Sequence, residues 1–433
     1  MPDKHPTRRE VLARIPTAAV ASSLGGVTTE WRRAAAAEAP DPPMRSDRKV
    51  RIGVVGGGFG SAFHWHEHPN AVVEAVSDLR SDRRDRLMRV YRCDKSYDSL
   101  EKLVLDKNVD AVAIFTGAPD HARHVVLSMK AGKHCISAVP ACLSLEEAEE
   151  MREVKEKTGL RYMMAETSCY RWETLTAKKL YADGQFGEIF YTEAEYYHNT
   201  AGGPERQSLW YYQGKPTWRY GYPPMLYVTH ATGFLVGVTG ERLVRVSCLG
   251  WADDDPAYQE NAYRNPFTNQ MALFQTERGN ICRCGQFRKV HAGGERAQWF
   301  GTKMTMYMAG DAGQPFVIRQ PGRPDITQLP NYWHRVPRAM RRDSGHGASH
   351  PFLTHEFITA LVEDREPAID LYESLAMTVP GILAHHSSLK DGEQMRIPDF
   401  GRAADRGNAP RAGHDPGALD FKAAGAEPGT KHL

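Results

Sequence analysis

A run of glycines near the start of the chain has the spacing that lets a backbone approach phosphate groups. Gly56 and Gly58 lie in the segment 56–61, Gly-Gly-Gly-Phe-Gly-Ser, directly after the β-branched run 50–55. Gly56 permits a tight turn, and Gly58 lets the main chain approach a pyrophosphate. Ser61 stands where the pattern G-x-G-x-x-G has its third glycine, so we expect slightly wider packing between the strand and a following helix.

An acidic residue at the correct distance strengthens this prediction. Asp78 follows Gly58 by twenty residues and ends the second predicted strand, 72–78. A carboxylate at this point accepts hydrogen bonds from the ribose hydroxyls of NAD and repels a 2′-phosphate. Arg80 and Arg83 are close enough to leave NADP open. The alternative is an ordinary glycine-rich loop followed by a solvated acid.

Alternating strands and helices must position this turn. After the turn, the pattern predicts a helix that begins within 62–68, which would direct its N-terminal N–H groups at the phosphates. Further helix-like and strand-like segments then alternate over 100–105, 111–116, 121–131, 134–138 and 144–158. This order predicts an α/β protein whose residues 49–165 form a Rossmann domain with a doubly wound parallel sheet.

The pattern changes beyond residue 188, where long strand-like runs follow one another. These runs cover 189–198, 243–249, 271–277, 280–288 and 303–308. They predict a C-terminal α+β domain, 166–400, with a mostly antiparallel sheet. We also expect helices over 352–362 and 372–389, the second of them packing back near the cofactor domain.

The two ends of the chain have different compositions. Residues 1–37 contain Thr7-Arg8-Arg9-Glu10-Val11-Leu12, a weakly apolar stretch and a small-residue run, as a twin-arginine signal does. We therefore expect export to the periplasm by the twin-arginine machinery, although a basic, disordered arm is the alternative. Residues 38–48 are predicted to be a linker, and residues 401–433 a flexible tail.

The composition argues against several other classes of protein. The 55 basic and 53 acidic side chains give no reason to expect a nucleic-acid partner. Beyond the N-terminus, no apolar run reaches the roughly 20 residues of a membrane-spanning helix, so we expect no stable membrane anchor. The seven cysteines contain no C-x-x-C pair, which argues against a zinc site. His346, His350 and His355 lack a clustered carboxylate, so no metal site is expected there.

Four further motifs resemble the Gfo/Idh/MocA oxidoreductase family in order and spacing. They are Thr116-Gly117-Ala118-Pro119-Asp120-His121, Gly132-Lys133-His134-Cys135, Asp183-Gly184-Gln185-Phe186-Gly187-Glu188 and Gly301-Thr302-Lys303. The resemblance covers about residues 49–400 and implies bound NAD and an open sheet that binds substrate on one side and often oligomerises, so we expect a homo-oligomer. The cofactor residues that it implies are Gly56, Gly58, Phe59, Gly60, Asp78, Thr116, His121, Pro140 and Glu166.

One stretch departs from the sugar dehydrogenases of this family. They carry Glu-Lys-Pro where this chain has Ala138-Val139-Pro140, and Val139 cannot transfer a proton. The stretch is similar to the branch of NAD-dependent α-N-acetylgalactosaminidases, which have Glu-Val-Pro-Ala-Ala. Other similarities to that branch are the segment 163–171, Trp218-Arg219, and Tyr227-Val228-Thr229-His230. Ala231 stands where the branch has glycine, and His346-Gly347-Ala348 where it has His-Gly-Gly.

The resemblance implies a redox-assisted elimination, not hydrolysis by two carboxylates. Hydride passes from C3 of the sugar to bound NAD, a base removes the C2 proton, and the glycosidic bond breaks. Water then adds and the hydride returns. Because the cofactor is regenerated in each turnover, it can stay tightly bound, which suits an exported enzyme.

In this scheme three residues are expected to be catalytic. Tyr227 and His230 would lie near the C3 hydroxyl, and Tyr197 would be the base at C2, although Tyr196 could face the site in its place. The predicted substrate-binding residues are Glu166, Arg219, Tyr170 and His346. The alternatives are purely structural roles: His230 could be a buried core histidine, and Glu166 could form an ion pair with Arg171.

Two other functions stay open. One is a periplasmic NAD(P)-dependent sugar dehydrogenase in which Tyr227 and His230 replace the lysine. The other is a non-catalytic, dinucleotide-binding sugar sensor, for which the absence of lysine at Val139 is the main argument.

Overall fold

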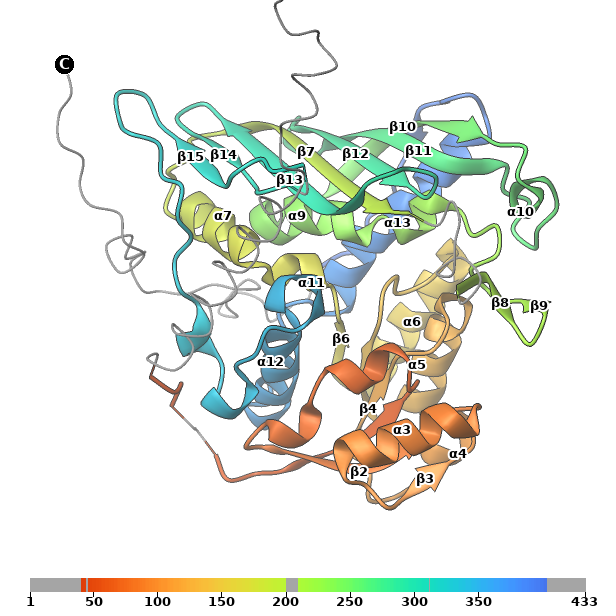
Figure 1. The fold of residues 1–433 in the computed structure, drawn as a ribbon. Helices are drawn as coiled ribbons and strands as arrows, with labels where there is room; N and C mark the ends of the chain where they lie inside the picture. Colours follow the sequence, from red (N-terminus) through yellow and green to blue (C-terminus); the bar gives the residue numbers. More distant parts are fainter. Residues whose placement is uncertain (1–39, 44–45, 200–208, 311, 403–433) are drawn as a thin grey trace, which may run out of the picture.

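The computed structural model describes residues 40–43, 46–199, 209–310 and 312–402. The predicted export signal, 1–37, and the predicted tail beyond residue 402 lie outside the described residues. Two sheets organise the chain, with a layer of helices between them (Figure 1).

The N-terminal sheet has six parallel strands in the order β3-β2-β1-β4-β5-β6, which confirms the predicted doubly wound arrangement. Its strands are β1 (Val50–Val55), β2 (Ala71–Ser77), β3 (Ser96–Tyr97), β4 (Ala111–Ile114), β5 (His134–Ser137) and β6 (Tyr162–Met164). The helices of this domain are α3 (Ser81–Tyr91), α4 (Leu100–Leu103), α5 (His121–Lys130) and α6 (Leu145–Thr158). The central strand β4 is apolar and buried along its whole length, as is typical of a parallel sheet with both faces covered by helices.

The prediction of a helix after the glycine turn is wrong. Two short 3₁₀ turns, η1 (Phe59–Ala62) and η2 (Trp65–Glu67), replace it, and His64 between them has a left-handed backbone with φ 51°. Phe63 and Trp65 are both fully buried, which an α-helix cannot achieve on one face because residues two apart point in nearly opposite directions. The phosphate-binding region therefore consists of the turn itself, without the dipole of a long helix behind it.

The C-terminal sheet has eight strands in the order β15-β14-β13-β7-β12-β11-β10-β16. All neighbouring pairs are antiparallel except β7 and β12, so the predicted, mostly antiparallel sheet is confirmed. The strands are β7 (Ile189–His198), β10 (Leu243–Ala252), β11 (Phe267–Thr276), β12 (Ile281–Phe287), β13 (Gly293–Gly301), β14 (Thr305–Tyr307), β15 (Val317–Arg319) and β16 (Met395–Arg396).

Helices cover the inner face of this sheet, beneath it in Figure 1. They are α7 (Trp172–Ala182), α9 (Thr229–Thr239) and α13 (Leu371–Ser388). As expected for 372–389, α13 also contacts α6 and β6 of the cofactor domain. A further helix, α12 (His350–Val362), packs against β1. None of the described helices is long and apolar enough to cross a bilayer.

Candidate functional site

A cleft with about 780 Å³ of empty space lies between the two domains. The cofactor domain contributes the loops that follow β1, β4, β5 and β6, and the second domain contributes β7 and the segments around residues 218, 230 and 346. The lining residues are Phe59, Phe115, Thr116, His121, Ala138, Val139, Ala165, Thr167, Tyr196, His198, Trp218, Arg219, Tyr227, His230 and His346.

The glycine turn is held in place by Asp78. The N–H of Gly57 donates to Asp78 Oδ2 at 2.7 Å, and the N–H of Arg80 donates to Oδ1 at 2.8 Å. Gly56 has φ 98°, and a Cβ there would lie 2.2 Å from the carbonyl oxygen of Phe115, so only glycine fits. A Cβ on Gly58 would meet only the Arg83 guanidinium, 3.7 Å away.

This open space above Gly58, beside the Asp78 carboxylate, suits a pyrophosphate and its ribose. The turn and Asp78 would hold those parts of a dinucleotide, and Phe59, Thr116 and His121 line the cleft beside them. Gly60 packs against the Phe115 ring, where a Cβ would lie 2.8 Å from Cδ2, and so contributes to the turn's shape.

His121 ties together two loops of the cofactor domain. Its Nδ1 lies 2.8 Å from the Pro140 carbonyl oxygen, and its Nε2 lies 3.1 Å from the Thr116 carbonyl oxygen. Burial lowers its pKa, because the charged imidazolium loses solvation there. Pro140 itself does not line the cleft. It lies behind it, as a hydrogen-bond acceptor for His121.

His230 is the second residue of α9, and its imidazole lies over a buried carboxylate. Nδ1 is 2.9 Å from Glu166 Oε1 and 3.3 Å from the Ser168 hydroxyl. Two glycines of α9 permit this approach, since a Cβ on Gly233 would lie 3.1 Å from Glu166 Cγ, and one on Gly237 would lie 2.8 Å from Cys169 Sγ. The helix therefore packs closely on the loop that carries Glu166.

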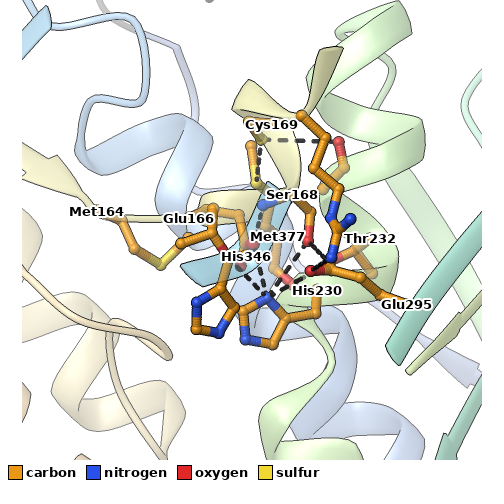
Figure 2. A network of polar contacts seen from close by, with 12 residues as sticks. Met164, Glu166, Ser168, Cys169, His230, Thr232, Glu295, His346 and Met377 are labelled. Atoms are coloured by element: carbon orange, nitrogen blue, oxygen red, sulfur yellow. Dashed lines mark hydrogen bonds and ion pairs between the residues drawn. The ribbon is translucent and has the colours of Figure 1, made fainter. Parts of the chain in front are cut away.

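A second buried carboxylate completes the environment of His230 (Figure 2). Glu295, on β13, lies with Oε2 4.0 Å from His230 Nδ1 and accepts a hydrogen bond from the Ser168 hydroxyl. Its other oxygen pairs with the guanidinium of Arg171, at the start of α7. Glu166 and Glu295 are both buried.

The charges of this cluster explain the pKa of His230. Burial alone would lower it, but the negative charges of Glu166 and Glu295 outweigh burial and raise the pKa to about 9. Burial would raise the pKa of Glu295, but Arg171 and His230 lower it to about 2. With His230 protonated, the two carboxylates, Arg171 and the imidazolium sum to zero charge.

Aromatic and cationic side chains form the wall beside His230. The ring centroids of Tyr227 and Tyr196 lie 5.2 Å and 4.6 Å from that of His230. The Arg288 guanidinium carbon lies 5.1 Å from the Tyr227 ring centroid, and that of Arg219 lies 5.9 Å from it. Burial raises the pKa of Tyr196, so its hydroxyl keeps its proton until another group accepts it.

His346 stacks on the other side of His230, at 5.9 Å between centroids and 19° between planes. Its backbone is left-handed, with φ 59°, and Gly347 and Ala348 also have positive φ. Burial, followed by the positive charge of His230, lowers the pKa of His346 to about 4. A neutral ring at this position can accept a hydrogen bond at neutral pH.

Three expectations need correction. Tyr197 alternates with Tyr196 along β7, so it points to the outer face of the sheet and stacks on Phe287 at 5.3 Å. Tyr170 is buried in the core and does not line the cleft. Glu166 is also fully buried and is not among the lining residues, and its Oε1 lies 2.9 Å from His230 Nδ1.

Sequence reasoning missed several members of the site. The sequence indicates Glu166 as the partner of Arg171, whereas in the structure Arg171 forms an ion pair with Glu295. The other residues that were not assigned are Ser168, His198, Trp218, Arg288 and Glu295. Ser168 and Trp218 lie in motifs that carried the family resemblance, but no local pattern marks Glu295.

The described lining residues include no lysine, and Val139 occupies the wall where dehydrogenases of the resembled family have one. Within the described residues, no group of three or more His, Cys, Asp or Glu side chains could hold a metal ion. The titratable side chains among the described lining residues are two tyrosines, four histidines and Arg219.

Comparisons with known proteins agree with these features. Residues 50–166 match the Gfo/Idh/MocA model, described as oxidoreductase family, NAD-binding Rossmann fold. Residues 328–405 match the model of the glycosyl hydrolase 109 C-terminal domain.

Two curated relatives extend over most of the chain. A glycosyl hydrolase family 109 protein of Solibacter usitatus (strain Ellin6076) is 24% identical over 333 residues, which cover 70% of this chain and 74% of the relative. One from Saccharopolyspora erythraea is 23% identical and covers 95% of this chain and 97% of the relative. A solved levoglucosan dehydrogenase, in complex with NADH and L-sorbose, has the same fold, with a TM-score of 0.69 and 15% identity. The similarity covers 82% of this chain and 100% of the dehydrogenase chain.

The fold and the matched domain define this chain as an NAD-binding enzyme of the oxidoreductase fold. Its cofactor domain is of the Gfo/Idh/MocA type, and the chain is similar to the family 109 glycosyl hydrolases, which confirms the resemblance predicted from its motifs.

Proposed function

We propose that this protein is an NAD-dependent glycosidase that cleaves its substrate by transient oxidation at C3, elimination and re-reduction. The observation that carries the proposal is the cleft itself. A histidine whose Nδ1 faces two buried carboxylates stands beside two tyrosines, in a cleft whose described lining includes no lysine. The relatives named as family 109 glycosyl hydrolases support a carbohydrate substrate.

When bound, NAD supplies a reversible hydride acceptor for the sugar's C3. The chain's own residues then manage the protons. His230, with Tyr227 beside it, accepts the proton of the C3 hydroxyl and later returns it. The negative charges of Glu166 and Glu295 make the imidazole a strong proton acceptor.

Tyr196 is the better candidate for the base at C2, in place of Tyr197, because its ring lines the cleft. The positive charge of Arg288, 5.6 Å from its ring centroid, favours the phenolate that proton removal from C2 requires. Arg219 and His346, also in the lining, are placed to orient hydroxyl groups of the sugar.

A sugar dehydrogenase is the second candidate. Its supporting observation is that the rings of Tyr227 and His230 lie side by side in the cleft, with centroids 5.2 Å apart, where they could transfer protons without a lysine. It differs from the first candidate in its cofactor balance, since a dehydrogenase consumes NAD, whereas the glycosidase regenerates it.

The test is incubation of the purified protein with p-nitrophenyl glycosides, with and without added NAD. Release of nitrophenol without net NADH is the expected result. Net NADH from a free sugar, without glycoside cleavage, would establish the dehydrogenase in its place. His230→Ala should abolish the activity, with His334→Ala, outside the cleft lining, as a matched control.

Export by the twin-arginine pathway remains part of the proposal. It is supported by the Arg8-Arg9 motif and by the fit between a retained cofactor and a compartment without free NAD. A fusion of residues 1–45 to a reporter that is active only in the periplasm tests it, with Arg8→Lys/Arg9→Lys as the control.

A further inference from the structure

A short segment of the second domain reaches back across the cofactor edge of the parallel sheet. The hairpin of β8 (Tyr211–Tyr212) and β9 (Lys215–Pro216) begins this segment, and Trp218 and Arg219 end it. We call residues 210–219 the strap.

The strap contacts the cofactor domain on both sides of the glycine turn. The Arg80 guanidinium carbon lies 4.2 Å from the Tyr212 ring centroid, just after β2. Trp218 covers Gly117, just after β4, where a Cβ would lie 2.7 Å from the indole Cδ1. Since β1 lies between β2 and β4 in the sheet, these two contacts, six residues apart in the strap, flank the turn that follows β1.

The Arg80 contact is fixed from the cofactor domain. The Arg80 guanidinium pairs with Asp82, with Nη2 2.6 Å from Oδ2. The backbone N–H of Arg80 donates a hydrogen bond to the Asp78 carboxylate. The Arg80 and Tyr212 side chains therefore meet directly beside the predicted ribose site. The Tyr212 side chain remains 41% exposed, which leaves part of its ring open to a ligand.

The other end of the strap is anchored to the second domain. The Tyr263 hydroxyl donates to the Trp218 carbonyl oxygen at 2.6 Å, and the Arg219 guanidinium carbon lies 4.2 Å from the Trp218 ring centroid. At the base of the hairpin, the Thr217 N–H bonds the Trp210 carbonyl oxygen at 2.8 Å. The cation–π pair between Tyr212 and Arg80 joins the hairpin to the cofactor domain, and it must break for the hairpin to lift.

We propose that the strap closes over a bound dinucleotide, with the Arg80–Tyr212 pair holding its adenosine half, and thereby limits the rate at which the cofactor enters and leaves. Phenol rings and guanidinium planes both stack on adenine, so the pair suits this part of the ligand. The inference rests on the proposed function only in taking NAD as the ligand. It explains how an enzyme that regenerates its cofactor would retain it.

The experiment measures cofactor exchange without any substrate. NADH fluorescence in a stopped-flow instrument gives the association rate, and displacement of bound NADH by excess NAD gives the dissociation rate. Tyr212→Ala should raise both rates about two- to five-fold, the change expected for loss of one partly exposed cation–π contact. Tyr212→Phe keeps the ring and should exchange like the wild type.

Arg80→Gln breaks the same contact from the other domain and should accelerate both rates as well. Melting temperatures of all variants establish that they are folded. Unchanged rates in both Tyr212→Ala and Arg80→Gln would overturn the proposal. So would faster dissociation with unchanged association, because the strap would then contact the bound cofactor without limiting its entry. Since no turnover is needed, a protein that fails to cleave glycosides can still pass this test.

Discussion

At the scale of single residues, His230 has a charge that its neighbours set. Glu295 contributes one of the two negative charges beside it, so Glu295→Gln should lower the pKa of His230 from about 9. Proton acceptance needs the neutral imidazole, and kcat/KM should therefore rise with pH up to about 9 in the wild type. In Glu295→Gln the rise of kcat/KM with pH should move to lower pH, by about one unit or more.

Glu193→Gln is the matched control, because Glu193 pairs with Arg283 on the outer face of the sheet. The free energy of unfolding provides a second measurement, which does not depend on enzyme activity. A raised folded-state pKa stabilises the protein fully below about pH 6.5, and this contribution is lost as pH rises through about 9. Comparison of denaturant unfolding at pH 7 and pH 10 should show this loss in the wild type and a smaller one in Glu295→Gln. Identical pH profiles in the wild type and Glu295→Gln would show that Glu295 does not set the pKa of His230.

Tyr196 and Tyr197 offer a matched pair of substitutions one residue apart. Tyr196→Phe removes a hydroxyl from the cleft and should lower kcat by about 10²- to 10³-fold, as loss of a general base does. Tyr197→Phe changes the outer face and should stay within about two-fold of the wild type. Steady-state rates on the best glycoside measure both. A large loss in Tyr197→Phe alone would reverse the assignment.

The members of the site that could be predicted stand next to recognisable motifs. Tyr227 and His230 belong to one four-residue motif, within which α9 begins, so sequence spacing sufficed. Glu295 could not be found in this way. It lies sixty-five residues after His230, and only the register of β13 against β7, which pairs Glu295 with Tyr196, brings it to the cluster. Pairing between distant strands has no local sequence signal.

At the scale of elements, the close packing of α9 on the loop beneath it is the feature most sensitive to volume. Gly237→Ala would place a Cβ 2.8 Å from Cys169 Sγ in a buried contact. We expect the free energy of unfolding to fall by about 1–3 kcal/mol, despite the better helix propensity of alanine. Thermal and denaturant melts measure the loss.

Cys169→Ala supplies the control for this prediction, since it removes the sulfur that the new methyl group would meet. The double variant, Gly237→Ala with Cys169→Ala, should recover much of the stability lost in Gly237→Ala. Simple additivity of the two losses would show that the contact is not the cause.

The elements themselves were predicted where one kind of pattern dominated. The β-branched run of β1 and the alternation of strand-like and helix-like segments after it identified the parallel sheet, and β7 was predicted with its observed bounds. The 3₁₀ turns η1 and η2 were not, because the burial of Phe63 and Trp65 against α12 and against Phe115, just after β4, depends on tertiary contacts. β13 was also missed, since Gly-Gly-Glu-Arg has low strand propensity and only pairing makes it a strand.

At the scale of the whole molecule, the two faces of the eight-stranded sheet differ. Helices cover the inner face, whereas the outer face exposes large apolar side chains on adjacent strands. Their exposed fractions are 63% for Leu249, 54% for Trp251, 52% for Leu273 and 44% for Ile281. Neighbouring strands β10, β11 and β12 carry them, so they form one patch.

A contiguous apolar patch of this kind is typical of an interface between subunits. We therefore predict that a second copy of the chain covers the outer face, as the expected homo-oligomer requires. Leu249→Lys with Leu273→Lys would bury two charges in that interface and should shift the molar mass measured by light scattering to that of a monomer. Leu105→Lys is the matched control, because Leu105 is 75% exposed but lies in the cofactor domain. An unchanged molar mass in the double variant, or dissociation in Leu105→Lys, would place the interface elsewhere. Because the cleft lies on the other side of this sheet's helices, the monomer should keep its rate of cofactor exchange, and that separates loss of assembly from loss of fold.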